Sequence, residues 1–167
     1  MGDESMEKKE TLNKDLKTEN KGNYTGGETL HEVFEKEKIL RTIINNSHMV
    51  LFLWKNEDKW PVEFVSENVA NFGYTAEDFT SGKVMYRDII YPEDIEKVHR
   101  EFDKIIKGKA PEFDIEYRIY TKSKDVRWIN QRTLVQKGPD GKITHFQGVV
   151  LDITNRKKSE EKLEKVL

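Results

Sequence analysis

The most constraining feature of this 167-residue sequence is a strict alternation of apolar and polar residues in its last third. The alternation separates two sets of side chains, Phe113, Ile115, Tyr117 and Ile119 against Asp114, Glu116, Arg118 and Tyr120. A period of two predicts a β-strand with one buried face. Two more β-rich segments follow, over 126–136 and 143–151, and a Pro139-Asp140-Gly141 turn joins them. Because short turns connect neighbouring long strands, the three strands are expected to pair antiparallel.

The sequence ahead of these strands predicts one amphipathic helix and a hairpin. Apolar residues recur at steps of three and four between Leu30 and Ile44, and they also fit a heptad seam that Glu37 interrupts. Packing onto the chain's own domain and a coiled coil both remain open for this helix. Val50–Trp54 and Val62–Val65 then predict the two strands of a hairpin.

Short helices and one longer helix are expected between the hairpin and the last three strands. Ser66 is a predicted cap for a helical turn that Gly73 ends, and the spacing of Thr75 to Asp78 is that of a capping box. Pro92 is predicted to begin the longer helix, whose apolar face is Ile95, Val98, Phe102, Ile105 and Ile106. Together the elements predict an α+β fold with about five antiparallel strands and helices on one face.

Composition divides the chain into a folded part and solvated ends. Apolar residues make up 35% and charged residues 36%, whereas globular domains use about 45–50% apolar residues. The predicted divisions are a disordered tail over 1–27, the amphipathic helix within 28–47, a domain over 48–154 and the start of a C-terminal helix over 155–167.

Charge and residue usage exclude several functions. The chain has no cysteine, so disulfides and thiolate chemistry are excluded. Its 29 basic and 31 acidic residues are interleaved and give a net charge of −2, which disfavours nucleic acid as a partner. No apolar run is long enough to span a membrane and no leader is evident, so a cytoplasmic protein is expected. No phosphate-binding glycine loop or nucleophile motif is present, and the chain is expected to be non-catalytic.

Five motifs in order resemble the PAS (S-box) sensory domain. The segment 66–79 resembles its helical region and Tyr91–Asp94 its Pro-acid-Asp helix start. The remaining motifs are similar to its C-terminal PAC portion, here 111–154, and they are Glu116-Tyr117-Arg118, Arg127-Trp128 and the "DIT-x-R-K" signature within Gly148–Lys157. The chain departs from the family at Ser123-Lys124, where Asp-Gly is usual, and at Tyr91, where a histidine often precedes the proline.

The resemblance implies a five-stranded sheet that encloses a small pocket with the helices. It also implies a sensory domain that detects a small ligand or mediates dimerisation, and that signals through its C-terminal helix to a histidine kinase or another output domain, in cis or in trans. The kind found in sensor histidine kinases fits best. A homodimer is expected, built on the first helix and on the outer sheet face with Trp128, Val149 and Leu151. An interaction module without a ligand stays open as an alternative.

Strand parity within this implied fold predicts the pocket lining. The candidate ligand-pocket residues are Phe102, Ile115, Tyr117, Ile119, Ile129, Gln131, Thr133, Phe146 and Val150. Their polar groups are few, which is typical of ligand pockets, but a filled core has the same pattern.

The cofactor of such a pocket is not determined by the sequence. Flavin is disfavoured, because the adduct-forming cysteine of LOV domains is absent and hydrocarbon side chains, Ile119, Ile129 and Val150, stand where those domains place amides. Haem is kept as an alternative, since haem-binding PAS domains take an axial histidine from the long helix and His99 lies there. A boundary histidine is the simpler interpretation of His99, and no metal site is expected.

The end of the last strand is the predicted signal junction, with candidate residues Asp152, Ile153, Thr154, Arg127 and Trp128. The Asp152 carboxylate is expected to cap the exit helix or to pair with Arg127 or Arg132, while Thr154 offers a second cap. Two competing arrangements of this kind would suit a switch.

Overall fold

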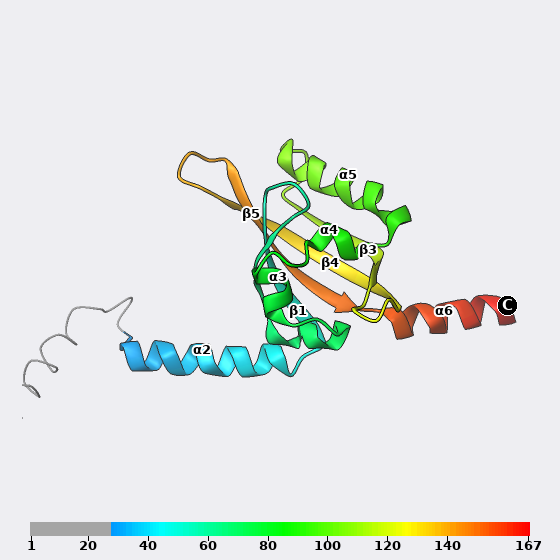
Figure 1. Cartoon of the computed structure of the whole chain (residues 1–167), viewed down its shortest axis with the longest axis horizontal. Coiled ribbons are helices and arrows are strands. Elements are labelled where there is room, and N and C mark those ends of the chain that lie inside the picture. Colours follow the sequence, from blue (N-terminus) through cyan, green and yellow to red (C-terminus); the bar gives the residue numbers. More distant parts are fainter. Residues whose placement is uncertain (1–27) are drawn as a thin grey trace, which may run out of the picture. The chain divides into compact units, whose positions relative to one another are not determined.

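The computed structural model describes residues 28–167 (Figure 1), and the tail expected over 1–27 lies outside the described residues. The chain divides into two compact units between Thr42 and Ile43. The first described helix, α2 (Leu30–Asn45), spans this division and has no buried residue. Among residues 28–167 no helix combines the length and the apolar character needed to cross a membrane.

A five-stranded antiparallel sheet forms the centre of the second unit, as the alternation predicts. Its strands are β1 (Met49–Lys55), β2 (Val62–Val65), β3 (Glu112–Tyr120), β4 (Val126–Lys137) and β5 (Ile143–Asp152). The strand order is β2-β1-β5-β4-β3, so the first hairpin joins the last three strands through the pairing of β1 with β5. The sequence predicts each of these strands to within about a residue at its ends.

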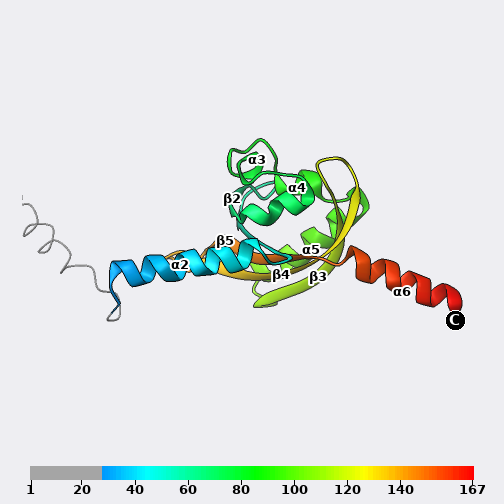
Figure 2. The ribbon, with the colours of Figure 1, turned by 90° about the horizontal axis from the view of Figure 1, so that it is seen from below.

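Four short helices and the longer α5 lie over one face of the sheet (Figure 2). They are η1 (Glu67–Phe72), α3 (Ala76–Thr80), α4 (Tyr86–Ile89), η2 (Pro92–Asp94) and α5 (Ile95–Ile106), and α6 (Thr154–Val166) leaves the end of β5. Pro92 begins a 3-10 turn and not α5 itself, and α4 has no counterpart in the sequence prediction. The apolar face of α5 buries Val98, Phe102 and Ile105 against the sheet.

Local hydrogen bonds explain the turns between these helices. Thr75 and Asp78 form the predicted capping box, with 3.1 Å from Asp78 N to Thr75 Oγ1. Ser66 stands at the start of η1, but its side chain does not cap it. The Ser66 hydroxyl instead accepts from Leu51 N on β1, at 2.9 Å, and donates to the Asn68 side chain, so the predicted capping role of Ser66 is wrong.

At the β3–β4 turn Lys124 takes a positive φ of 71°, which is the conformation that glycine adopts readily.

Candidate functional site

The inner face of the sheet and α5 enclose the predicted pocket residues. All nine are buried, each at 6% exposure or less, and they come from α5, β3, β4 and β5: Phe102, Ile115, Tyr117, Ile119, Ile129, Gln131, Thr133, Phe146 and Val150. Parity therefore assigned the inner faces of the last three strands correctly. Burial alone does not distinguish a ligand pocket from a filled core.

Three aromatic residues that the sequence analysis did not assign to this site occupy its centre. Phe52 and Trp54 stack with 5.1 Å between ring centroids, and Tyr86 meets the Trp54 ring edge-on at 5.0 Å. Applying the same parity rule to β1 would have identified Phe52 and Trp54, since they alternate with exposed or half-buried neighbours. Tyr86 lies on the short α4, and no periodic pattern indicates it.

A chain of hydrogen bonds runs through the interior between buried polar side chains. The hydroxyls of Tyr86 and Tyr117 are 2.7 Å apart, Tyr117 donates to Gln131 Oε1, and Gln131 Nε2 donates to Thr133 Oγ1 at 2.8 Å. Burial raises the pKa of Tyr86 and of Tyr117 above the ordinary tyrosine value, so both are neutral phenols at physiological pH. This series of hydrogen bonds links α4 to β3 and β4 without using any charged group.

Trp54 carries a buried hydrogen-bond donor that lies outside this series of hydrogen bonds. Its side chain is fully buried, and within residues 28–167 its indole Nε1 has no hydrogen-bond partner. The ring lies over Gly148 of β5, where a Cβ would fall 2.3 Å from Trp54 Cζ3. Since buried N–H groups almost always have a partner, the unsatisfied Trp54 donor is an unusual feature of this interior.

His99, the candidate haem ligand, lies beside the interior and not in it. It is half-buried on α5, and its ring centroid is 4.6 Å from that of Trp60. The Trp60 ring in turn stacks on Phe102 at 4.6 Å. Trp60 is thus in ring contact with both His99 and Phe102, an arrangement that gives His99 a packing role and does not favour it as an axial ligand.

The predicted signal junction forms a compact set of hydrogen bonds. Asp152 Oδ1 accepts from Thr154 N at 2.9 Å and from the Thr154 hydroxyl at 2.6 Å. Thr154 Oγ1 also accepts from Trp128 N on β4 at 3.0 Å, and Ile153 N donates to Trp128 O at 2.9 Å. The other oxygen of Asp152 lies 3.5 Å from Arg127.

Asp152 accepts from the first main-chain N–H of α6 and lies 3.5 Å from Arg127 at the same time, so the structure contains together two contacts that the sequence analysis gave as alternatives. Arg132 is not a partner of Asp152, because it pairs with Asp114 at 2.9 Å. The Thr154 side chain does not supply the second cap, since its hydroxyl donates to Asp152 and accepts from Trp128 N.

A second set of contacts, which the sequence analysis missed, attaches α6 to β3. Glu116 forms an ion pair with Lys157 at 2.7 Å and another with Arg156, and these two cations lower the pKa of the Glu116 carboxyl. Arg156 and Lys157 belong to the "DIT-x-R-K" signature and Glu116 to the "EYR" motif, but no pattern in the sequence indicates that these motifs meet. Lys157 also lies 5.0 Å from the ring of Trp128.

Arg118, on the same strand, connects β3 to the start of α5. Asp94 accepts from the Arg118 main-chain N at 2.8 Å and from its Nε and Nη2 at 2.9 and 2.7 Å. These bonds lower the pKa of the Asp94 carboxyl, and the carboxylate raises the pKa of the guanidinium. The Arg118 guanidinium also stacks over the Tyr91 ring at 4.1 Å, so the non-family Tyr91 has a defined contact.

The chain thus combines a sheet with helices over one face, a buried uncharged interior and an exit helix bound to the strands. The PAS-fold family matches residues 62–150, and the chain belongs to this family. The PAS sensory domain that the motifs predict is thereby confirmed.

Relatives and solved structures agree with this assignment. The chain is 47% identical over 127 residues to the methyl sulfide methyltransferase-associated sensor of Methanosarcina acetivorans. The matched segment covers 76% of this chain and 13% of that protein. It is 30% identical to a blue-light-activated histidine kinase of Brucella anthropi over 66% of this chain and 26% of that one. A sensory box histidine kinase/response regulator structure from Burkholderia thailandensis has the same fold, with a TM-score of 0.59 and 21% identity over 78% of this chain and 94% of that one. The chain thus spans only a small part, 13% and 26%, of the Methanosarcina sensor and the Brucella kinase.

Proposed function

We propose that this PAS domain relays a change in its interior through α6 to an output module, a histidine kinase in a phosphorelay. One observation carries the proposal: Tyr117, at the centre of the buried hydrogen-bond chain, is flanked on β3 by Glu116, which binds α6. Successive residues of a strand point to opposite faces, so β3 holds the interior with one side chain and α6 with the next.

The relay follows from the rigidity of this connection. A change that shifts Tyr117 must shift the backbone of β3, and Glu116 then moves relative to the sheet end where Asp152 and Thr154 fix the first turn of α6. The ion pairs and these hydrogen bonds together then favour one orientation of the helix over another. A ligand drives such a change only by binding one of the two states more tightly.

The stimulus that fits this interior is a small uncharged molecule with a hydrogen-bond acceptor. The nine lining residues and the central Phe52, Trp54 and Tyr86 include no charged side chain, so a charged ligand would lose its hydration without gaining a counter-charge. The unpartnered Trp54 Nε1 supplies the donor for the acceptor group. The packing of His99 on Trp60 supports this class of ligand over haem.

The output module would lie in the same polypeptide or in a partner, and the domain would act as a homodimer. The two curated relatives described above are a sensor and a histidine kinase, and both are much longer than the matched segment. The exit helix α6 is suited to connect a small sensing domain of this kind to a larger protein.

A fusion of the chain, through α6, to a histidine-kinase catalytic region tests the relay. Tyr117→Phe serves as an interior perturbation, and we expect it to change autophosphorylation by about fivefold or more, the lower end of usual allosteric coupling. In a Glu116→Gln background the same perturbation should have little effect. Glu161→Gln removes one charge from α6 at an exposed position and serves as the matched control. An effect of Tyr117→Phe that persists unchanged in the Glu116→Gln background would overturn the proposed route.

A further inference from the structure

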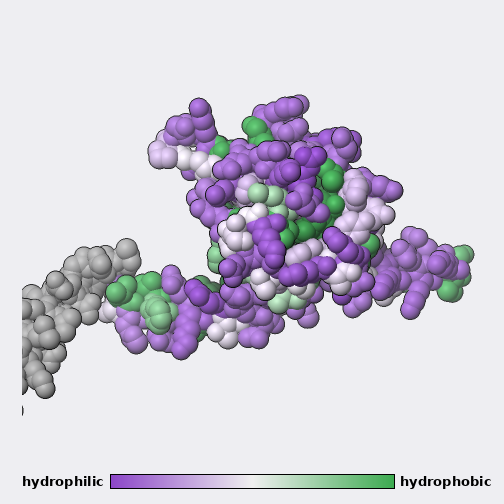
Figure 3. Space-filling model, in the orientation of Figure 1, coloured by the Kyte–Doolittle hydropathy of each residue, from purple (hydrophilic) through white to green (hydrophobic). Residues whose placement is uncertain are grey.

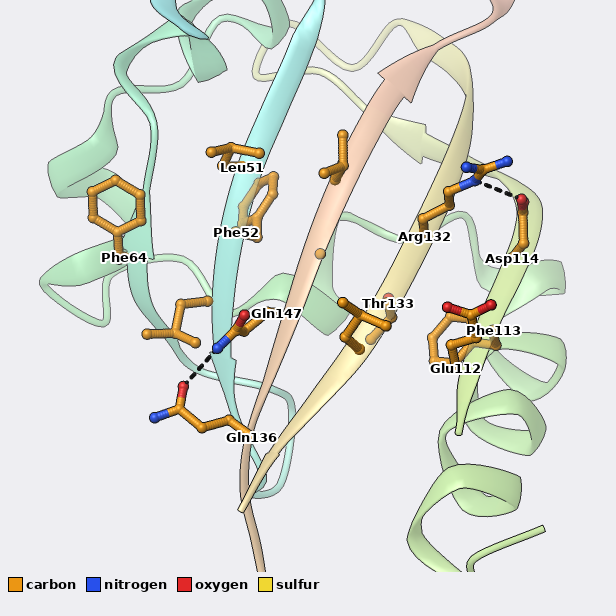
Figure 4. Close-up of a pocket in the computed structure, with 14 residues that line it drawn as sticks. Leu51, Phe52, Phe64, Glu112, Phe113, Asp114, Arg132, Thr133, Gln136 and Gln147 are labelled. Atoms are coloured by element: carbon orange, nitrogen blue, oxygen red, sulfur yellow. Dashed lines mark hydrogen bonds and ion pairs between the residues drawn. The ribbon is translucent and has the colours of Figure 1, made fainter. Parts of the chain in front are cut away.

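The sheet separates the interior from the outer face of the domain. A groove of about 850 Å³ lies on that outer face (Figure 4), and Leu51, Leu53 and Phe64 are among its lining residues. The hydrogen-bonded strands of the sheet lie between this groove and the interior. On the opposite face, Figure 3 shows hydrophobic residues at the surface in the area of α4 and α5. A neutral molecule that reaches the interior is therefore expected to enter on the side of the helices.

The loop between β1 and β2, residues 56–61, places one aromatic side chain on this side of the interior. Residues 57–59 are exposed, whereas Trp60, which follows them, is 5% exposed. The Trp60 ring stacks on Phe102 of α5, with 4.6 Å between the ring centroids. Phe102 in turn meets the Trp54 ring edge-on, at 6.5 Å. A line of rings thus leads from the exposed tip of the loop to the buried indole of Trp54.

The backbone that carries Trp60 is strained. Lys59 and Trp60 are consecutive, and their φ angles are 62° and 49°, in the left-handed region that side chains rarely adopt. Such a conformation persists only where surrounding contacts hold it. The Trp60 ring contacts Phe102 and His99 of α5, and the main-chain oxygen of Lys59 accepts from Arg87 N of α4 at 3.2 Å. These contacts with α4 and α5 hold the loop closed against a backbone that favours another conformation.

Both ends of the loop are bound to the sheet. Lys55 N donates to Pro61 O at 2.8 Å, and Asn56 N donates to Thr144 O of β5 at 2.9 Å. Residues 57–60 lie between these two attachments. A movement of this short segment breaks its contacts with α4 and α5 and leaves the pairing of β1 with β2 and β5 in place.

We propose that Trp60 is the gate of the interior, and that small neutral ligands enter and leave when residues 57–60 swing away from α5. The closed loop covers Phe102 and excludes water, whereas the open loop relieves the two left-handed residues of their strain. This inference rests on the ligand binding proposed above, but not on the relay through α6. A gate changes the rates of entry and exit alike, so its removal is expected to alter both rates and to leave the affinity nearly unchanged.

Hydrogen exchange of the Trp54 indole N–H tests the gate without any ligand. This group is fully buried and has no hydrogen-bond partner within residues 28–167, so its exchange with D₂O depends on the access of solvent to the interior. Trp60→Ala is expected to accelerate the exchange by about tenfold, as measured by NMR. Trp128→Ala makes the same truncation on the outer face of the sheet and should leave the rate unchanged. The β4 amides report global opening, and the comparison is made at equal protection of these amides.

A second variant tests the strain and leaves the buried rings intact. Glycine adopts the left-handed region without steric cost, so Lys59→Gly favours the closed loop. We expect this variant to slow the Trp54 exchange, the opposite direction to Trp60→Ala. An exchange rate that Lys59→Gly leaves unchanged or raises would contradict a strained gate.

Cyclopentanone, a small neutral ketone, tests passage through the gate. Its association and dissociation rate constants, from NMR line shapes, should both rise about tenfold in Trp60→Ala, while Kd changes by less than about twofold. Equal Trp54 exchange in the wild type, Trp60→Ala and Trp128→Ala would overturn the gate, whether or not the ketone binds. Faster exchange in Trp60→Ala without binding of the ketone would instead keep the gate and contradict the proposed class of ligand.

Discussion

The indole ring of Trp54 lies against the backbone of Gly148, in the space that any other side chain at position 148 would occupy. A Cβ at Gly148 would stand 2.3 Å from Trp54 Cζ3 and 3.0 Å from the main-chain oxygen of Arg132. The glycine therefore allows β1 and β5 to pair while the largest side chain of β1 fills the interior. The Trp54 ring, and with it the unpartnered Nε1, is fixed in place by this contact.

Gly148→Ala is expected to destabilise the protein because the new methyl group overlaps the Trp54 ring. Overpacking of this kind costs about 1–3 kcal/mol, which urea denaturation measures. Gln147→Ala, at the exposed neighbouring position, is the control and should cost less. In a Trp54→Phe background the smaller ring leaves room, so Gly148→Ala should cost less there than in the wild type. Equal costs in the two backgrounds would mean that the ring is not what excludes the methyl group.

The Asp94–Arg118 pair makes stability depend on pH in acid. Because the pKa of Asp94 is lower in the folded protein than in the unfolded chain, the pair contributes fully above the unfolded value of about 3.9, and the contribution is lost as the pH falls through the folded pKa. Asp94→Asn should cost about 2 kcal/mol at neutral pH and flatten the acid limb of the stability curve. Glu93→Gln, whose carboxylate is 3.5 Å from Arg118 and exposed, should leave that limb nearly unchanged.

Tyr117 and Tyr86 are expected to differ in their contribution, although both are buried. Tyr117 lies between Tyr86 and Gln131, so Tyr117→Phe leaves the Tyr86 hydroxyl and Gln131 Oε1 without a partner, whereas after Tyr86→Phe the Tyr117 hydroxyl still donates to Gln131. Each such group costs about 1–3 kcal/mol. Denaturation of the two variants should therefore rank Tyr117→Phe as the less stable. The opposite ranking would indicate that the chain of hydrogen bonds does not extend to Gln131.

The unpartnered N–H of Trp54 predicts which small molecules the interior prefers. Cyclopentanone, cyclopentane and cyclopentanecarboxylate have similar rings but differ in acceptor and charge. We expect the ketone to bind most tightly and to shift the indole N–H resonance of Trp54 in NMR spectra, because this N–H gains an acceptor. Trp54→Phe should remove the preference for the ketone over the hydrocarbon, and Trp128→Phe should keep it. Tightest binding of the carboxylate would contradict a neutral-ligand interior.

Much of this fold could be predicted from the sequence because its strands alternate strictly. The alternation at Phe113–Tyr120 determines which side chains are inside, and the structure places Ile115, Gln131 and Val150 there. The same rule was not extended to β1, which left Trp54 out of the site. A lone Tyr86 on a four-residue helix carries no periodic signal, so its place in the interior depends on tertiary packing alone.

The contacts of α6 could not be predicted for a related reason. The hydrogen bond from Thr154 N to the Asp152 side chain is local and follows from residue type and position. The ion pairs of Glu116 with Arg156 and Lys157 join residues about 40 positions apart, and their meeting depends on the direction in which α6 leaves β5. Ser66 shows the converse case, since its side chain has a local role available but bonds to the distant Leu51 instead.

Hydrogen exchange of the α6 amides in Tyr117→Phe tests the central claim most directly, because it asks whether an interior change reaches the exit helix. Ile105→Val, a mild core substitution on α5, controls for general loss of stability. The account predicts that Tyr117→Phe alters exchange in the first two turns of α6 more than Ile105→Val does at equal global stability, and that Glu116→Gln removes this difference. Identical α6 exchange in Tyr117→Phe and Ile105→Val, with changes confined to β3 and β4, would contradict it.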